Sequence, residues 1–368
     1  MWTLNDGDSS SASRPSPAAV VAFCVCAVVL GALGMAGCPR ERGRSAQAPS
    51  PSPQASPAKA AERELSGTIA FVRVLAEEPA RTALWAIDLG GEGQAREVVV
   101  SPPGQWLDNP WPGPEPGTVF LDIWRGGAEP EEAEFDIVLC DLATGKLSSI
   151  TTDGQSALPV WCAEKQRLFF VRRAGWQSQA IVSMTPEGED RLVVWEPSNG
   201  ELWLPSALAC SPDGSWLAVA DDAGDCVTVA MFVDTARQEA HWAWEGGVPE
   251  PLAGLTLPED LVISAARWSH DGTRIALITQ RAEVAESTAS LAGPAFVFEP
   301  ASGKLTKILD DALALSWAPD DSALVVSQSV EYEQGRGSRL MIVAPGGEEP
   351  TLLVDYAWRP AWCRQKEK

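Results

Sequence analysis

The chain has 368 residues, of which 50 are acidic and 28 basic, so its formal net charge is −22. Such an excess of carboxylates excludes a nucleic-acid binder, because phosphate contacts need a basic surface. The apolar share of 45% and the charged share of 21% are those of a globular protein. Only two histidines, His241 and His270, are present, which excludes mechanisms that need several imidazoles.

The N-terminus carries a targeting pattern. An uncharged apolar run covers residues 18–35 and leads into Met35-Ala36-Gly37-Cys38. Small residues before a cysteine resemble the lipobox of bacterial lipoproteins, so residues 1–37 are expected to be a signal peptide. The resemblance implies lipidation of Cys38, which would anchor the chain on the exported side of a bacterial envelope membrane. The alternative is an uncleaved membrane helix, since 18 residues just span a bilayer.

A linker follows the anchor. Residues 38–66 are rich in Pro, Ser and Ala and show no apolar periodicity. Such a composition cannot bury a core, so we expect a disordered tether. Residues 67–368 are then the folded body.

The folded body is a repeat. Its turn-and-strand cores read VWCAEKQRLFFV (160–171), LACSPDGSWLAVA (208–220), ARWSHDGTRIALI (266–278) and LSWAPDDSALVVS (315–327). The leading position holds Trp161, Cys210, Trp268 or Trp317, with Trp111 before and Trp362 after, at spacings of 50, 49, 58, 49 and 45 residues. A unit near 50 residues with several short strands predicts a blade of a β-propeller.

The Ser-Pro-Asp-Gly turn in these cores has a physical rationale. Pro sets φ, Asp bonds its own backbone and Gly adopts positive φ. Trp-Ser-Pro-Asp-Gly followed by an apolar strand resembles the TolB-type, WD-like propeller repeat, and the resemblance covers roughly residues 67–363. It implies a six-bladed propeller that serves as a protein-interaction platform.

The two ends of the body complement each other. The first blade starts at Gly67 with an apolar strand and no Trp-turn before it, whereas the chain ends with a Trp-type strand around Trp362. We therefore predict an all-β, six-bladed propeller closed by pairing of the C-terminal strand into the first blade.

Trp161, Trp268, Trp317 and Trp362 recur in register, which predicts packing between adjacent blades. Of the cysteines after Cys38, Cys162 and Cys210 are expected on the inner strands of adjacent blades, one position apart in register. Side-chain alternation would then point them either toward each other or away. The sequence thus leaves open a disulfide or two small buried thiols.

The loops between the second and third strands of the blades are expected on one rim. They carry thirteen acidic residues: Glu77, Glu78, Glu129, Glu131, Glu132, Glu134, Asp221, Asp222, Asp225, Glu283, Glu286, Glu331 and Glu333. We call this set the acidic rim. It favours either solubility or a mouth for a cationic partner, and calcium is the ion it would hold if the oxygens converge.

No G-x-S-x-G elbow, phosphate loop or CxxC pair occurs in the sequence. We therefore expect no catalytic residue, resident cofactor or structural metal. The leading functional hypothesis is a non-catalytic, envelope-anchored scaffold that binds a protein or a glycan. The competing hypothesis is a carboxylate-dependent or calcium-dependent propeller enzyme, such as a lactonase or a glycan lyase.

Overall fold

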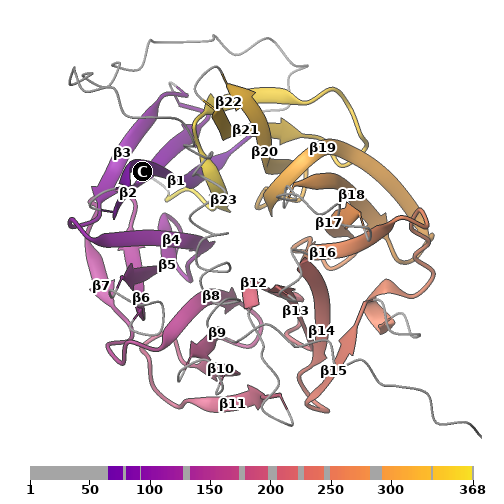
Figure 1. The fold of residues 1–368 in the computed structure, drawn as a ribbon, viewed down its shortest axis with the longest axis horizontal. Helices are drawn as coiled ribbons and strands as arrows, with labels where there is room; N and C mark the ends of the chain where they lie inside the picture. Colours follow the sequence, from indigo (N-terminus) through magenta and orange to yellow (C-terminus); the bar gives the residue numbers. More distant parts are fainter. Residues whose placement is uncertain are drawn as a thin grey trace, which may run out of the picture.

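The computed structural model describes ten segments of the chain: residues 65–77, 80–91, 93–126, 133–173, 179–197, 205–222, 228–243, 249–281, 292–332 and 335–366. These segments are built from 23 β-strands and one short 3₁₀ turn, η2 (Glu250–Leu252). Figure 1 shows the strands stacked in radial sets around a centre. The predicted all-β propeller is confirmed. The signal peptide and residues 38–64 of the linker lie outside the described residues, so their boundaries stay predictions.

The strand pairings form sheets of eight, four, four and seven strands. The eight-stranded sheet is two antiparallel sets of four joined by one parallel pairing of β2 with β4, and the seven-stranded sheet is two sets that share β19, so the body contains six sets, which we call blades. Blade 1 consists of β23 (Trp358–Cys363), β1 (Gly67–Glu77), β2 (Ala80–Leu89) and β3 (Ala95–Val100). Blade 2 consists of β4 (Gln105–Pro112), β5 (Thr118–Arg125), β6 (Glu134–Asp141) and β7 (Leu147–Ser149). Blade 3 consists of β8 (Ser156–Cys162), β9 (Arg167–Arg173), β10 (Gln179–Met184) and β11 (Leu192–Trp195).

The later blades follow the same order. Blade 4 consists of β12 (Pro205–Cys210), β13 (Trp216–Asp222), β14 (Thr228–Asp234) and β15 (Glu239–Trp242). Blade 5 consists of β16 (Leu261–Trp268), β17 (Ile275–Arg281), β18 (Gly293–Glu299) and the first part of β19 (Lys304–Trp317). Blade 6 takes the second part of β19, then β20 (Leu324–Tyr332), β21 (Gly335–Val343) and β22 (Thr351–Asp355).

The ends of the chain meet in blade 1, where β23 pairs antiparallel with β1 and aligns Trp362 with Ile69. The Trp362 indole N–H donates to the carbonyl of Ser66 at 2.9 Å. The C-terminal strand therefore lies where the sequence predicts it, beside the first strand of the body.

The recurring tryptophans pack backward between blades. Trp161 contacts Phe120 of blade 2 and Trp268 contacts Phe232 of blade 4, with ring centroids 6.4 and 6.0 Å apart. The Trp317 indole donates to the carbonyl of Arg267 in blade 5 at 3.0 Å. The prediction of inter-blade packing is confirmed, and each indole covers the blade that precedes its own.

The turns after the inner strands have the predicted chemistry. In blade 4 the Asp213 carboxylate accepts from the Ser211 hydroxyl and from Ser215, while Gly214 has a φ of 67°. Blade 5 repeats the arrangement with Asp271 at the same place. Because the Asp bonds within the turn and Gly tolerates positive φ, the turn closes without strain.

Within the described residues, no helix is long and apolar enough to cross a membrane.

Candidate functional site

A buried cluster of charged side chains lies where the inner strands of blades 1, 2 and 3 begin. It consists of Asp108 and Asn109 of β4, Asp122 of β5, Arg173 of β9 and Arg359 of β23, and we call it the central charged cluster. Arg359 Nε lies 3.4 Å from Asp108 Oδ1. Asp122 Oδ2 accepts from the Asn109 side chain at 2.8 Å and from the Leu158 backbone N–H at 3.0 Å. The cluster thus ties three blades together through carboxylates.

Irregular backbone positions this cluster. Asn109, Leu158 and Arg359 have φ values of 49°, 56° and 48°, and each precedes a proline. At all three places the pairing with the neighbouring strand shifts register, as in a β-bulge. Left-handed backbone at a non-glycine residue costs about 1–3 kcal/mol and needs support from its surroundings. The bond from Leu158 N–H to Asp122 supplies part of that support.

Burial changes the acidity of Asp108, whose side chain is 14% exposed. Desolvation raises the pKa of Asp108 to about 6, with a smaller contribution from Asp122, while Arg359 opposes the shift. Asp108 Oδ1 and Arg173 Nε have no hydrogen-bond partner in the described part of the chain. A carboxyl group that titrates near neutral pH beside a second carboxylate can exchange a proton under physiological conditions.

A stacked pair of side chains joins the inner strands of separate blades. The Arg267 guanidinium lies 3.7 Å from the centroid of the Trp111 ring, and its Nη1 donates to the carbonyl of Leu315 in blade 6 at 2.6 Å. Burial lowers the pKa of Arg267 to about 9. The stack joins blades 2, 5 and 6 across the centre, a cation–π contact strengthened by removal from water.

The register of Trp111 differs from the sequence interpretation, which aligned it with Trp161. In blade 2 it is Pro112 that pairs with Val119, across the same seven residues that separate Trp161 from Leu168. Trp111 is therefore one position early, and alternation along the strand turns it from the blade interface toward Arg267. Pro110 stands two residues before Pro112, as Pro159 and Pro360 stand two residues before Trp161 and Trp362, so these prolines mark the register that the Trp spacing misses.

Most residues of the acidic rim lie outside the part of the chain that the structure describes. Strand order places its members at the ends or within the connections of second and third strands. Only Glu134 and Glu331 have described side chains, and both are exposed. Glu134 lies 3.6 Å from Arg125, and Glu331 lies 3.0 Å from Arg336 of its own hairpin. The backbone of Glu77, Asp221 and Asp222 lies within described strands, and the other eight lie outside the described residues. The acidic rim stays a prediction.

Three tryptophans outside the Trp register of the repeat, Trp124, Trp176 and Trp203, are candidates for stacking on a ligand. Trp176 and Trp203 lie outside the described residues, whereas Trp124 is half-buried and stacks on Phe135 at 6.5 Å. Within the described residues, no group of three or more His, Cys, Asp and Glu side chains is placed to hold a metal ion.

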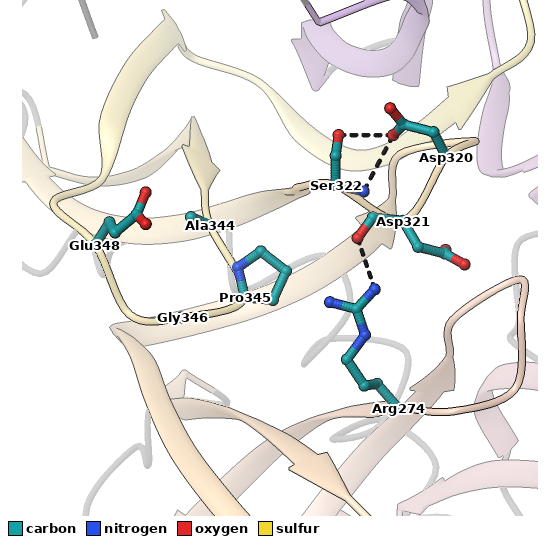
Figure 2. Close-up of a pocket in the computed structure, with 8 residues that line it drawn as sticks. All are labelled: Arg274, Asp320, Asp321, Ser322, Ala344, Pro345, Gly346 and Glu348. Carbon is teal, nitrogen blue, oxygen red and sulfur yellow. Dashed lines mark hydrogen bonds between the residues drawn. The ribbon is translucent and has the colours of Figure 1, made fainter. Parts of the chain in front are cut away.

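A shallow hollow of about 420 Å³ lies on the face of the first-to-second strand turns, at the junction of blades 5 and 6. Its lining is Arg274, Asp320, Asp321, Ser322, Ala344, Pro345, Gly346 and Glu348 (Figure 2). Asp321 accepts from the backbone N–H groups of His270 and Asp271 at 2.9 Å each, and Arg274 donates to its carbonyl at 2.8 Å. Because these groups bond one another across the junction, the hollow is primarily a contact between two blades.

Several solved structures resemble the chain. TolB from Acinetobacter baumannii matches with a TM-score of 0.59 and 19% identity, covering 82% of this chain and 68% of that one. A chain of a nidogen/laminin complex matches with a TM-score of 0.54 and 10% identity, covering 82% of this chain and 100% of that one. An oligogalacturonate lyase in complex with manganese reaches a TM-score of only 0.44 at 13% identity, with 71% of each chain covered, which supports no functional argument.

These similarities show the propeller fold alone. A comparison with curated proteins finds no match. The family model of the lipoprotein LpqB β-propeller domain matches residues 149–357, more than half of the chain and four of its six sets of strands. The chain therefore belongs to the family of the lipoprotein LpqB β-propeller domain.

Proposed function

We propose that the protein is a non-catalytic scaffold of the bacterial cell envelope that binds a positively charged partner protein. Membership in a lipoprotein propeller family supports an envelope location. The sequence Met35-Ala36-Gly37-Cys38 supports a lipid anchor at Cys38, with the propeller held on the exported side of the membrane.

The observation that carries the proposal is the distribution of charge. The chain has a net charge of −22, and the thirteen acids of the predicted acidic rim lie in or next to the connections between second and third strands. The two members with described side chains, Glu134 and Glu331, are 62% and 70% exposed. Arg125 and Arg336 neutralise part of this charge, and the remaining excess of acids speeds the encounter with a partner of the opposite sign.

The test is crosslinking in the native envelope with two matched charge variants of the full chain. One variant neutralises Glu129, Glu131 and Glu132 of the rim to Gln. The control neutralises three acids near turns of the opposite face, Glu187, Glu189 and Glu348. The proposal expects that the rim variant loses most of the captured partner and that the control keeps it. Equal capture by both variants would remove the rim as the binding surface, and no capture above background by the wild type would refute the scaffold.

A second candidate is a carboxylate-dependent enzyme, and the pair of Asp108 and Asp122 favours it. Two carboxylates in unequal environments, one with its pKa raised to about 6, are the equipment of general acid–base catalysis. Glycan and lactone substrates would then be turned over by the wild type and not by Asp108→Asn. Calorimetric titration with calcium tests the metal-dependent version, which requires saturable binding.

A further inference from the structure

Two cysteines end the inner strands of neighbouring blades. Cys210 ends β12 at the position that Trp161, Trp268 and Trp317 hold in other blades, so it departs from the repeat. Cys162 ends β8 at the next position, which holds Ser211 and Ser269 in blades 4 and 5 and a cysteine again in β23. The tryptophan position faces the preceding blade, and side-chain alternation makes the next position face the following blade. The two cysteines therefore face each other across the interface of blades 3 and 4.

The structure brings the two sulfur atoms to one place. Cys162 Sγ lies 3.8 Å from the carbonyl oxygen of Ser211, and Cys210 Sγ lies 3.0 Å from the same oxygen. Cys162 Sγ also lies 3.6 Å from the carbonyl oxygen of Pro212, the next residue of the blade 4 turn. Both cysteines belong to one apolar cluster that spans the two blades. A large side chain at position 210 would fill the space that the two sulfurs share.

The surroundings keep this contact tight. A Cβ atom on Gly214 would lie 3.0 Å from Cys162 Sγ and 2.4 Å from the Lys165 side chain. Gly214 also has a φ of 67°, which the turn requires. The turn of blade 4 thus packs directly against Cys162 and Lys165 of blade 3.

The pair differs chemically from the other described cysteines. The hydrogen bond from Cys210 and one from the Lys165 backbone lower the pKa of Cys162 to about 7. Burial raises the pKa of Cys140 and of Cys363 to about 12. Because the thiolate is the reactive form, Cys162 is the more reactive thiol of the described residues, whereas the pKa of Cys210 is raised well above its usual value and those of Cys140 and Cys363 disfavour their thiolates.

We propose that Cys162 and Cys210 form a reversible disulfide that joins blades 3 and 4, made by thiol–disulfide exchange with a small-molecule or protein disulfide on the exported side of the membrane. A thiolate of the pair attacks one sulfur of the oxidant, which breaks the oxidant's S–S bond and releases one thiolate. The second cysteine loses its proton and attacks the protein sulfur of the mixed disulfide, which releases the second thiolate. Two protein thiols lose two electrons, and the oxidant's disulfide becomes two thiols.

The bond would act as a redox-dependent brace. It closes a loop of 48 residues that contains the outer strands of blade 3 and the inner strand of blade 4. A crosslink over such a loop restricts the unfolded chain, and we expect the melting temperature to rise by about 5 °C on oxidation.

The test treats the full-length protein with oxidised glutathione or with dithiothreitol, alkylates the free thiols and maps the peptides by mass spectrometry. The proposal expects a Cys162–Cys210 crosslinked peptide and a loss of 2 Da in the oxidised sample only. Cys140 and Cys363 stay unmodified while the protein is folded and are alkylated after denaturation.

Serine variants provide the controls. Cys162→Ser and Cys210→Ser should each abolish the gain in melting temperature on oxidation, whereas Cys363→Ser, at the same register position in β23 as Cys162, should keep it. The wild-type mapping alone decides the proposal if a variant fails to fold. Both thiols remaining free after oxidised glutathione, or a bond from either one to Cys226, would overturn it.

Discussion

At the scale of single residues, burial decides what the charged side chains can do. Asp108 and Arg267 are both ionisable groups on inner strands. Burial raises the pKa of Asp108 and lowers the pKa of Arg267, and both shifts favour the neutral form of the side chain. Arg267 is compensated by the Trp111 ring and a backbone carbonyl. Asp108 has Arg359 at 3.4 Å but an oxygen without a hydrogen bond. The central charged cluster therefore carries an energetic cost at Asp108.

This cost increases as the pH rises through the acidic range. The pKa of Asp108 is about 6 in the folded protein against 3.8 for an ordinary aspartate. Between these values the unfolded chain releases its proton first, so the contribution of Asp108 to stability falls as pH rises from about 4 to about 6. The loss is on the order of 2–3 kcal/mol, from 1.36 kcal/mol for each unit of pKa shift.

We therefore predict that Asp108→Asn removes this pH-dependent component. Between pH 4.5 and pH 7, the free energy of unfolding in urea should shift by about 2 kcal/mol in favour of the variant relative to the wild type. Other carboxylates titrate equally in both proteins and cancel in the comparison. A difference between the two proteins that does not change with pH would contradict the assignment.

At the scale of elements, the turn after each inner strand connects one blade to the next. The turn of blade 5 donates the backbone N–H groups of His270 and Asp271 to the Asp321 carboxylate, and His270 Nδ1 lies 2.8 Å from the same carboxylate. Asp321 itself sits at a φ of 58°, where blades 4 and 5 have glycine. The aspartate thus replaces a glycine of the repeat and gains a bonding role between blades.

Asp321→Ala should destabilise the protein by about 2 kcal/mol, because it leaves two backbone donors without their charged acceptor and keeps a strained backbone. The matched control is Asp320→Ala, since Asp320 accepts hydrogen bonds from Ser322 of its own turn. We expect the control to lose less than half as much free energy of unfolding, measured by chemical denaturation. A larger loss for Asp320 than for Asp321 would show that the turn, rather than the junction, carries the stability.

At the scale of the whole molecule, stability depends on joining the two ends of the body. Trp362 in β23 is 1% exposed and packs with residues of β1 and of blade 6 in one apolar cluster. One side chain near the C-terminus therefore links the first blade to the last. Loss of this contact exposes the edge of β1 as well as the face of blade 6.

We predict that Trp362→Ala lowers the free energy of unfolding by about 3–5 kcal/mol, the usual range for a fully buried tryptophan. Tyr356→Ala is the matched control in the same segment, because Tyr356 is 56% exposed. Its loss should stay near 1 kcal/mol or below. A change of less than 1 kcal/mol for Trp362→Ala, measured by the shift in urea midpoint, would mean that the C-terminal strand does not hold the fold together.

Local patterns in the sequence determined the architecture. The recurring Trp positions, the Asp-Gly turns and the mismatch between the two ends predict the sets of strands and the pairing of β23 with β1, because each reflects backbone geometry within a few residues. They also placed Cys162 and Cys210 on the inner strands of adjacent blades and left open whether the two side chains face each other.

Only the tertiary structure decided which side chains meet at the centre. Asp108, Asp122, Arg173 and Arg359 come from four strands of three blades, and no spacing in the sequence relates them. The bulges at Asn109, Leu158 and Arg359 each shift the strand pairing by one residue, and turn patterns in the sequence do not reveal so small a shift. Each shift nevertheless reverses the face of the strand on which the following residues lie. Trp111 lies against Arg267, and Cys162 against Cys210, because alternation acts on the register of the folded strands.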